Sequence, residues 1–191
     1  MTIDSIISVC LGVGLAASVG FRVFLPLFTL SVAAYFNVWE LNESWQWVGS
    51  STAIITLGVA TIVEIFAYFI PYVDNALDSI AVPLAALAGT AVMLSTVADL
   101  SPVVTWALAI IAGGGTAAAI SGSSGTTRLA STATTGGLAN PVVSTIETGT
   151  SMVMSVLSIF VPVLAFLFVI LIMFFIFKLY KKFSRSKASN R

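Results

Sequence analysis

The sequence predicts an all-α integral membrane protein, a helical bundle with about six membrane segments and Gly-broken or re-entrant helices. Hydrophobic residues make up 58% of the 191 positions and charged residues only 8%, and the mean hydropathy is +1.06. A soluble globular domain carries about 25% charged residues, so this chain has too little polar surface to face water on all sides. Its apolar stretches recur at the length of about 20 residues that a spanning helix needs. We therefore expect the lipid bilayer to be its main partner.

The first segment, residues 5–36, consists of two apolar pieces at 5–19 and 23–36, separated by Gly20-Phe21-Arg22. Each piece is too short to span a bilayer comfortably. Together they predict either one kinked helix or a re-entrant hairpin. The polar stretch at 37–48 carries acids and three tryptophans, which is typical of a non-cytoplasmic membrane interface; the tryptophans are Trp39, Trp45 and Trp47.

Three spans are predicted in the middle of the chain, at 49–70, 79–98 and 103–120. Turns at 71–78 and 99–102 connect them, and Pro83 kinks the second span or delays its start. The stretch at 121–140 is polar with a single charge, and we interpret it either as an exposed linker or as the lining of a wet cavity. Residues 141–177 are too long for one crossing and contain Pro162, so they predict two helices.

The charge is divided sharply along the chain. Residues 1–177 hold all eight acids but only Arg22 and Arg128, so the body carries −6 and the tail +6. We expect a membrane helical domain at 1–177 and a disordered tail at 178–191, held in the cytoplasm by its positive charge. Beside a bilayer these cations lie close to lipid phosphates, so no nucleic-acid partner is expected. The basic residues of the tail are Lys178, Lys181, Lys182, Arg185, Lys187 and Arg191.

Charged residues within apolar segments indicate a buried polar site. Each costs about 2.5–3.5 kcal/mol at the centre of a spanning helix, so we expect them to pair with one another, with carbonyls, or to line water. Which arginine pairs with which carboxylate stays open. Each residue also has a structural alternative: Arg22 snorkels to the membrane surface, Glu64 reaches interfacial water, and Asp78 caps a helix that starts at Ser79. The candidates for a substrate or ion site are Arg22, Glu64, Asp74, Asn75, Asp78, Arg128, Asn140, Ser144 and Glu147.

Glycines suggest either helix breaks or close helix packing. Broken helices expose amides with a positive dipole that can face an anion or polar substrate. The candidates for helix breaks are Gly12, Gly14, Gly20, Gly113, Gly114, Gly115, Gly136 and Gly137. Residues 11–22 and 111–128 both run from glycines through alanines to a lone arginine, which indicates an internal, inverted repeat.

Known catalytic motifs are largely excluded. The chain has no histidine, a single cysteine (Cys10) and no GK[ST] phosphate loop, which removes serine–histidine, zinc-hydrolase and nucleotide-binding chemistry. We therefore predict that the protein is not an enzyme and that it carries no cofactor and no metal cluster.

Three motifs follow one another along the chain. The first is Gly20-Phe-Arg22-x-Phe-Leu-Pro26, the second is Glu64 followed by Ile70-Pro71-Tyr-Val-Asp74-Asn-Ala-Leu-Asp78 and Pro83, and the third is Gly136-Gly-Leu-Ala-Asn140-Pro-Val-Val-Ser144-Thr-Ile-Glu147. Together they resemble a bacterial membrane family known as domain of unknown function 4126. The resemblance covers nearly the whole chain except the basic tail, and it implies no activity. The chain departs from it at Thr148, where we expect an acid in many relatives, so the resemblance does not carry over a site of two adjacent carboxylates.

From these observations we expect a small transporter or channel-like protein of the bacterial inner membrane, with a buried arginine–carboxylate site for a small polar or anionic solute or ion. The alternative is a non-catalytic scaffold or assembly partner in which the same charges only lock helices together. Because so small a bundle often needs further copies to enclose a pathway, a homo-oligomer is also expected.

Overall fold

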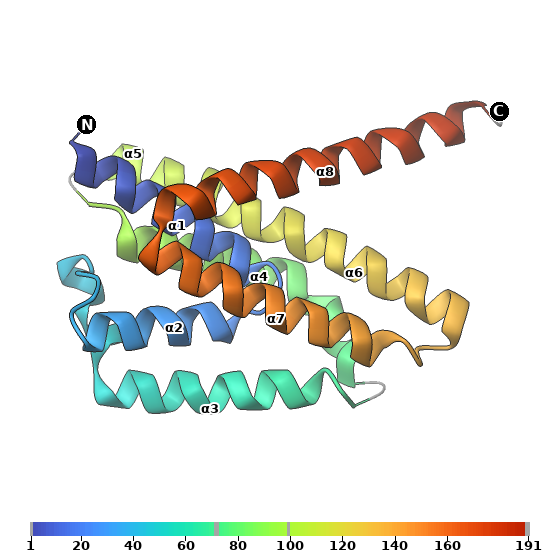
Figure 1. Ribbon diagram of the computed structural model, residues 1–191, viewed down its shortest axis with the longest axis horizontal. Coiled ribbons are helices and arrows are strands. Elements are labelled where there is room, and N and C mark those ends of the chain that lie inside the picture. The colour runs from blue at the N-terminus through green and yellow to red at the C-terminus, as the bar shows by residue number, and fades with distance from the viewer. Residues whose placement is uncertain (1, 71–72, 99, 190–191) are drawn as a thin grey trace.

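The computed structural model describes residues 2–70, 73–98 and 100–189, except for the side chains of 179 and 182–189. All regular structure in these residues is helical, so the predicted all-α class is confirmed. The elements are α1 (Ile3–Val19), α2 (Phe24–Tyr35), η1 (Glu43–Gly49), α3 (Ser51–Ala67), α4 (Val73–Thr96), α5 (Pro102–Leu108), η2 (Ala109–Gly114), α6 (Gly115–Thr135), α7 (Asn140–Phe160) and α8 (Pro162–Ser189) (Figure 1).

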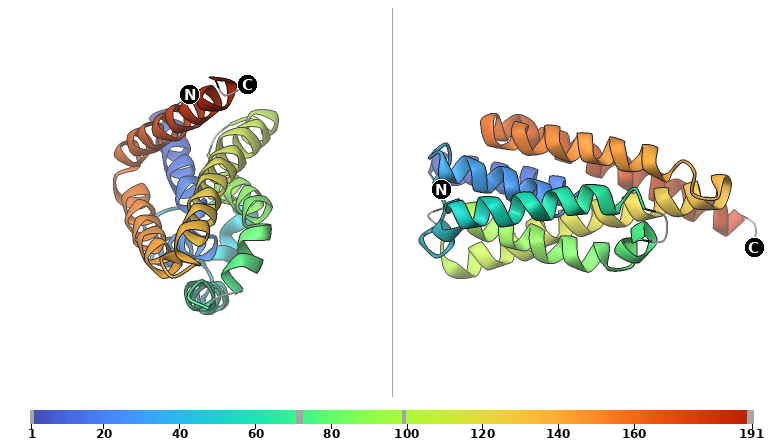
Figure 2. Two further views of the ribbon diagram at one scale, coloured as in Figure 1. Left: turned by 90° about the vertical axis from the view of Figure 1, so that its right-hand side faces the viewer. Right: turned by 90° about the horizontal axis from the view of Figure 1, so that it is seen from below.

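Helices α1 and α2 form a hairpin that enters the bundle from one end and returns to it (Figure 1). Both are short, with 17 and 12 residues, and their junction lies partway along α7 and not at the far end of the bundle. Helix α1 is central: it packs against α4, α6, α7 and α8 and buries an unbroken run from Cys10 to Val19. The other helices pass between the two ends, and the α6–α7 connection lies at the end opposite η1 (Figure 2).

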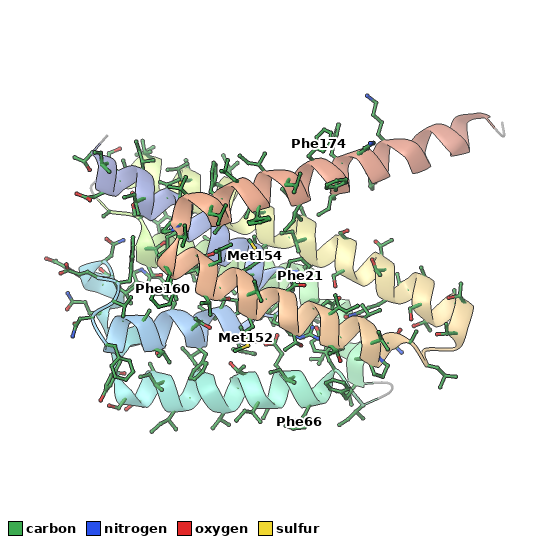
Figure 3. All side chains as sticks on the ribbon, in the orientation of Figure 1. Phe21, Phe66, Met152, Met154, Phe160 and Phe174 are labelled. Carbon is green, nitrogen blue, oxygen red and sulfur yellow. The ribbon has the colours of Figure 1, made fainter. Side chains whose placement is uncertain are left out.

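Three helical stretches among the described residues are long and apolar enough to cross a membrane: Val73–Thr96, Pro102–Thr135 and Asn140–Phe160. A fourth arises if η1 and α3, which meet at 65°, are counted together. The shorter apolar helices are Ile3–Val19, Phe24–Tyr35 and the stretch Pro162–Lys178. The outer surface is strongly apolar, and Figure 3 shows Phe66 of α3 and Phe174 of α8 pointing away from the bundle on opposite sides.

Helix boundaries follow local sequence. The side chains of Thr2 and Ser50 cap α1 and α3 by accepting a backbone N–H, as these residue types do at helix starts. Pro102 starts α5, where its missing N–H costs nothing. Pro162 separates α7 from α8 because the residue before a proline avoids helical geometry, and Val161 has φ −139° and ψ 66°.

Two predicted loops are wrong. Pro71 and Tyr72 of the turn at 71–78 lie outside the described residues, but α4 already begins at Val73, so Asp78 lies inside this helix and does not cap one. The polar stretch at 121–140, interpreted as either an exposed linker or the lining of a wet cavity, is helical to Thr135, so the linker alternative is wrong for this part. Four of its threonines donate their hydroxyls to carbonyls one turn back in the same helix, as Thr126 does to Gly122 at 2.8 Å, so weak apolar character does not stop the helix.

The structure describes only part of the basic segment at 178–191. Helix α8 continues past 178 to Ser189, in a segment that the sequence predicts to be disordered. The residues at 190–191, including Arg191, lie outside the described residues, as do the side chains of Lys182, Arg185 and Lys187. The division into domains at 177 stays a prediction.

Most of the glycines predicted to break helices serve close packing instead. Gly12 and Gly14 lie inside the continuous helix α1, and Gly113, Gly114 and Gly115 lie within one continuous stretch from α5 through the π-helical turn η2 to α6. A Cβ atom on Gly113 would lie 2.6 Å from the carbonyl oxygen of Gly89, and one on Gly89 2.8 Å from that of Gly113. These two glycines let α4 and η2 touch through their backbones.

Replacing Gly113 by alanine is therefore expected to destabilise the protein by about 1–3 kcal/mol, because the added methyl group meets backbone that cannot yield. The matched control is Gly125→Ala in α6, where a Cβ atom meets nothing within 4 Å. This control is expected to be neutral or to gain about 1 kcal/mol from helix propensity. The thermal unfolding midpoints of both variants in detergent measure the difference, and equal midpoints would contradict the proposed backbone contact.

Candidate functional site

The junction of the α1–α2 hairpin places Arg22 inside the bundle. Gly20 lies against α6, where a Cβ atom would approach Ile120 to 2.6 Å and the carbonyl oxygen of Ala117 to 2.8 Å. Only glycine lets the chain turn so close to α6. The turn leaves the Arg22 side chain 1% exposed, so the snorkelling alternative is wrong.

Arg22 uses every hydrogen-bond donor of its guanidinium. Its Nε donates to the Thr148 hydroxyl at 3.0 Å, and its Nη1 donates to the Phe21 carbonyl at 3.0 Å and to Glu147 Oε2 at 3.1 Å. Its Nη2 donates to the carbonyl and the hydroxyl of Ser144, at 2.9 and 2.6 Å. A guanidinium has five N–H groups, and all five have partners here. Arg22 therefore fastens the hairpin to α7 and has no donor left for a ligand.

Glu147 of α7 forms ion pairs with both arginines of residues 1–177, Arg22 and Arg128. Its carboxylate accepts from Arg22, from Arg128 Nε at 3.3 Å and from Arg128 Nη2, and it also accepts from the Ser124 hydroxyl. Glu147 and Arg128 are 5% and 2% exposed. A buried carboxylate shared by two guanidiniums is a strong, directional arrangement. We name Arg22, Arg128 and Glu147 the charged centre.

Arg128, unlike Arg22, keeps an unused donor. Its Nη1 is buried and has no hydrogen-bond partner among the described residues. Asp78 lies 3.8 Å from its Nε in a looser ion pair, and the Asp78 side chain is 21% exposed. Buried donors are almost always satisfied, so Nη1 is the position in the charged centre where a water or a solute oxygen is needed.

Tyr68 joins the two arginines and was missed from the sequence. The Arg22 and Arg128 guanidinium carbons lie 4.2 and 4.4 Å from the centroid of its ring, within the range of cation–π attraction. The signal was present, because Tyr68 follows Glu64 by four residues and so faces the same side of α3. Two further partners were not among the predicted site residues: Ser124, four residues before Arg128, and Thr148, directly after Glu147.

Glu64 has a role that the sequence did not predict. Its two carboxylate oxygens accept the backbone N–H groups of Val23 and Phe24, at 2.7 and 3.0 Å. These amides lie at the start of α2 and have no partner within the helix. A negative charge at a helix N-terminus also interacts favourably with the helix dipole. Glu64 is 9% exposed, so the interfacial-water alternative is wrong and α3 is tied to the hairpin beside Arg22.

A second polar set joins α4, α6 and α7. Asn140 Nδ2 donates to Asp74 Oδ2 and to the Thr132 hydroxyl, both at 3.1 Å. The Asp74 Oδ1 atom accepts the backbone N–H of Asn75 at 2.8 Å, and Asn75 itself is exposed. Gly136 and Gly137, with φ of 64° and 88°, end α6 here in the left-handed region, as the predicted helix break requires.

Two cavities adjoin these sets. One of about 280 Å³ reaches Glu147 and is bordered by Ser123, Ser124 and Thr127 of α6 together with apolar side chains. The other, of about 290 Å³, is lined by Tyr68, Asp74, Asn75, Thr132, Asn140 and residues of the α6–α7 connection. In the part of the chain that the structure describes, no three His, Cys, Asp or Glu side chains are grouped to hold a metal ion.

The structure thus divides the nine candidate residues. Arg22, Asp78, Arg128, Ser144 and Glu147 meet in or beside the charged centre, and Glu64 flanks it through α2. Asp74 and Asn140 belong to the second set, and Asn75 lies exposed at the cavity beside that set. The two lone arginines at the ends of the similar segments 11–22 and 111–128 converge on one carboxylate. The internal repeat itself stays a prediction.

Comparison with known proteins gives a family and no activity. No curated protein and no solved structure matches the chain. The sequence model of the family described as "Domain of unknown function (DUF4126)" matches residues 9–182, which include both polar sets and at least part of every helix. The chain therefore belongs to the family of domain of unknown function 4126.

Proposed function

We propose that the protein is an integral membrane transporter or channel-like protein of the bacterial inner membrane, which handles a small polar or anionic solute or an ion at its charged centre. One observation carries this proposal: buried charges gather at the junction of the short α1–α2 hairpin, and one of their guanidinium nitrogens, Arg128 Nη1, has no hydrogen-bond partner among the residues that the structure describes. Charges inside an apolar bundle mark substrate or ion pathways in membrane proteins.

The proposal that the protein resides in a membrane rests on its apolar surface and on its helices of spanning length. Large apolar side chains are exposed along α3, α7 and α8, including Phe66, Phe160 and Phe174, and contiguous apolar surface of this extent does not face water in soluble monomers. The Trp-rich segment of η1 and the end of α8 lie at opposite ends of the bundle (Figure 1). A cytoplasmic basic tail therefore places η1 outside, and α1 and α2 become a re-entrant hairpin that enters from the outside.

The charged centre offers a solute a limited set of groups. Arg22 is fully engaged, so it holds Glu147 and α7 in position. Arg128 Nη1 is free to donate to an oxygen of the solute, and Asp78, the more exposed and loosely paired carboxylate, can accept from it. The buried neighbours Glu147 and Tyr68 fix the orientation of the Arg128 guanidinium, which lowers the ordering cost of binding.

The scaffold alternative is favoured by a different observation. The contacts of Arg22 run to α7 and those of Glu64 to the start of α2, so both side chains also lock helices together. In this alternative the charged centre needs no access to water. Access is therefore the property that separates the two functions.

Single cysteines measure this access, in a Cys10→Ser background. We expect Thr127→Cys, at the cavity beside Glu147, to react with a membrane-impermeant, charged thiol reagent in open membrane fragments. Ile111→Cys is the matched control, because Ile111 is 75% exposed on an apolar helix and faces lipid in the proposed arrangement. Reaction at 127 with protection at 111 supports a wet centre within a membrane. A folded protein that is protected at both positions contradicts the transport proposal, and reaction at 111 contradicts membrane residence.

A further inference from the structure

An apolar groove lies between α3 and α4. Helix α3 occupies the edge of the bundle (Figure 2), where it packs on α2 and η1, whereas α4 packs on α1, α6 and η2. Val59, Val63 and Ile80 lie along the groove and are more than half exposed, so it opens sideways, toward lipid in the proposed arrangement. The groove has a volume of about 320 Å³, and its walls include Val59, Ala60 and Val63 of α3 and Ile80, Ala81 and Leu84 of α4.

A polar cavity adjoins the groove at one end. This cavity, of about 290 Å³, is the one at the α6–α7 connection, and Asp74, Asn75 and Thr132 are among its lining residues. Tyr68 of α3 lines both spaces, and on α4 the lining of the groove begins at Leu77, two residues after Asn75. The groove and the cavity therefore lie end to end along the same two helices, one apolar and the other polar. A molecule that fits both has an apolar chain and a polar head.

The length and direction of the groove match one leaflet of a bilayer. Its wall on α3 runs from Thr56 to Tyr68, which is about 18 Å at the rise of an α-helix. The hydrocarbon core of a bilayer is about 30 Å thick, so one leaflet contributes about 15 Å. The cavity lies at the end of the bundle opposite η1, and the groove runs from it toward the η1 end (Figure 1). A phospholipid has the same order, with its head at the membrane surface and its chains directed inward.

The charge around the cavity favours a head that carries positive charge and N–H donors. Asp74 lines the cavity, and no basic residue is among the described residues that do so. Helix α6 ends beside it at Thr135, and a helix C-terminus carries about half a negative charge. A carboxylate has about four acceptor positions, so Asp74 can accept from a head while it keeps its hydrogen bonds from Asn140 and Asn75. An anionic head finds no such partner there.

We propose that the groove and the cavity together bind one molecule of phosphatidylethanolamine, with an acyl chain between α3 and α4 and the ammonium group in the cavity. Removal of the chain from water or detergent supplies affinity. The ammonium group supplies selectivity, because hydrogen bonds between charged groups are stronger than neutral ones. This inference rests on the proposed membrane residence but not on transport.

The experiment is a lipid titration of the purified full-length protein in detergent. Phosphatidylethanolamine is expected to raise the thermal unfolding midpoint in a saturable way, by about 5 °C near one hundred times its dissociation constant. Phosphatidylcholine with the same acyl chains is the matched control, because its quaternary ammonium has no N–H. We expect it to need a concentration about tenfold higher, the equivalent of one strong hydrogen bond. A response to phosphatidylcholine or to anionic phosphatidylglycerol that equals that to phosphatidylethanolamine overturns the proposal.

Variants assign the effect to the two spaces. Ala81→Phe fills the groove and is expected to abolish the lipid response, and Ala60→Phe does the same from α3 if the first variant does not fold. Ala76→Phe is the matched control, since Ala76 is exposed on the same helix and lines neither space. Asp74→Asn is expected to retain a lipid response but to lose the preference for phosphatidylethanolamine. A lipid response that survives in folded Ala81→Phe or Ala60→Phe overturns the site, and a preference that survives in Asp74→Asn overturns the placement of the head.

The mass of the protein in detergent tests the other occupant of such a groove, a second copy of the chain. If Ala81→Phe converts a dimer to a monomer and leaves the lipid response unchanged, a second copy covers the groove and the proposal is wrong. The cysteine measurements separate this site from the proposed function. A selective lipid response without access at 127 supports this site and rejects only transport, whereas access at 127 without a selective response rejects only this site. Reaction at 111 rejects the membrane residence on which both depend.

Discussion

Replacing Glu147 by glutamine is expected to destabilise the protein by about 3–5 kcal/mol, because removing one partner of a buried ion pair leaves uncompensated charge behind. Here two guanidiniums lose their shared carboxylate. Arg22 and Arg128 are 1% and 2% exposed, so neither guanidinium can compensate for the loss by facing bulk solvent. The glutamine amide keeps the shape of the side chain but turns an N–H₂ group toward donors.

The thermal unfolding midpoint in detergent measures this effect, and we expect a fall of about 10 °C or more for a chain of this size. Glu43→Gln is the matched control, since Glu43 lies exposed in η1 and exposed charges contribute little. A Glu147→Gln midpoint equal to that of Glu43→Gln would show that the charged centre does not form.

Replacing Arg22 by methionine is expected to have an effect of similar size, since five hydrogen bonds are lost and the acceptors on the buried Ser144 lose their donor. The double variant Arg22→Met/Glu147→Gln should lose less stability than the sum of the two single variants. Contacting residues show coupling energies of about 0.5–3 kcal/mol. Additive losses would contradict direct contact between the two side chains.

The same double variant separates the two proposed functions. If the charges only lock helices together, the variant loses any cellular role of the protein only in proportion to its loss of stability. In a transporter it loses the role even under conditions where it remains folded, because Arg128 loses the carboxylate that orients it. Arg22→Met/Glu43→Gln is the control cycle, and its two substitutions should be additive because Glu43 lies in the exposed η1 segment.

Local sequence patterns predicted much of the helical framework. The break at Gly20-Phe21-Arg22 and the division at Pro162 both lie where the sequence placed them, since glycine and proline act through backbone geometry within a few residues. The wrong predictions, the loops around 78 and at 121–135, came from reading low hydrophobicity as absence of helix. Hydroxyl side chains can donate to carbonyls of their own helix, so a segment with few apolar residues can still be helical.

The predicted pairing of charges was correct in kind but not in detail. The cost of burying a charge required partners for Arg22, Arg128 and Glu147 wherever the helices lay. For Glu64 the expected partner was an arginine, a carbonyl or water, and the observed partners are the amides at the start of α2. Helix N-termini attract carboxylates as cations do, but which helix start lies beside Glu64 depends on packing.

Composition and backbone preference are properties of short segments, so they already indicated a helical chain with a largely apolar surface and ionic groups inside it. Which of these groups meet depends on how distant segments of the chain pack together. Arg22 and Glu147 are 125 residues apart in the chain, and Asp74 and Asn140 are 66 apart. Spacing along one chain carries no information about such pairs, since their distance is set by how close the glycines of α1, α4 and η2 let the helices approach.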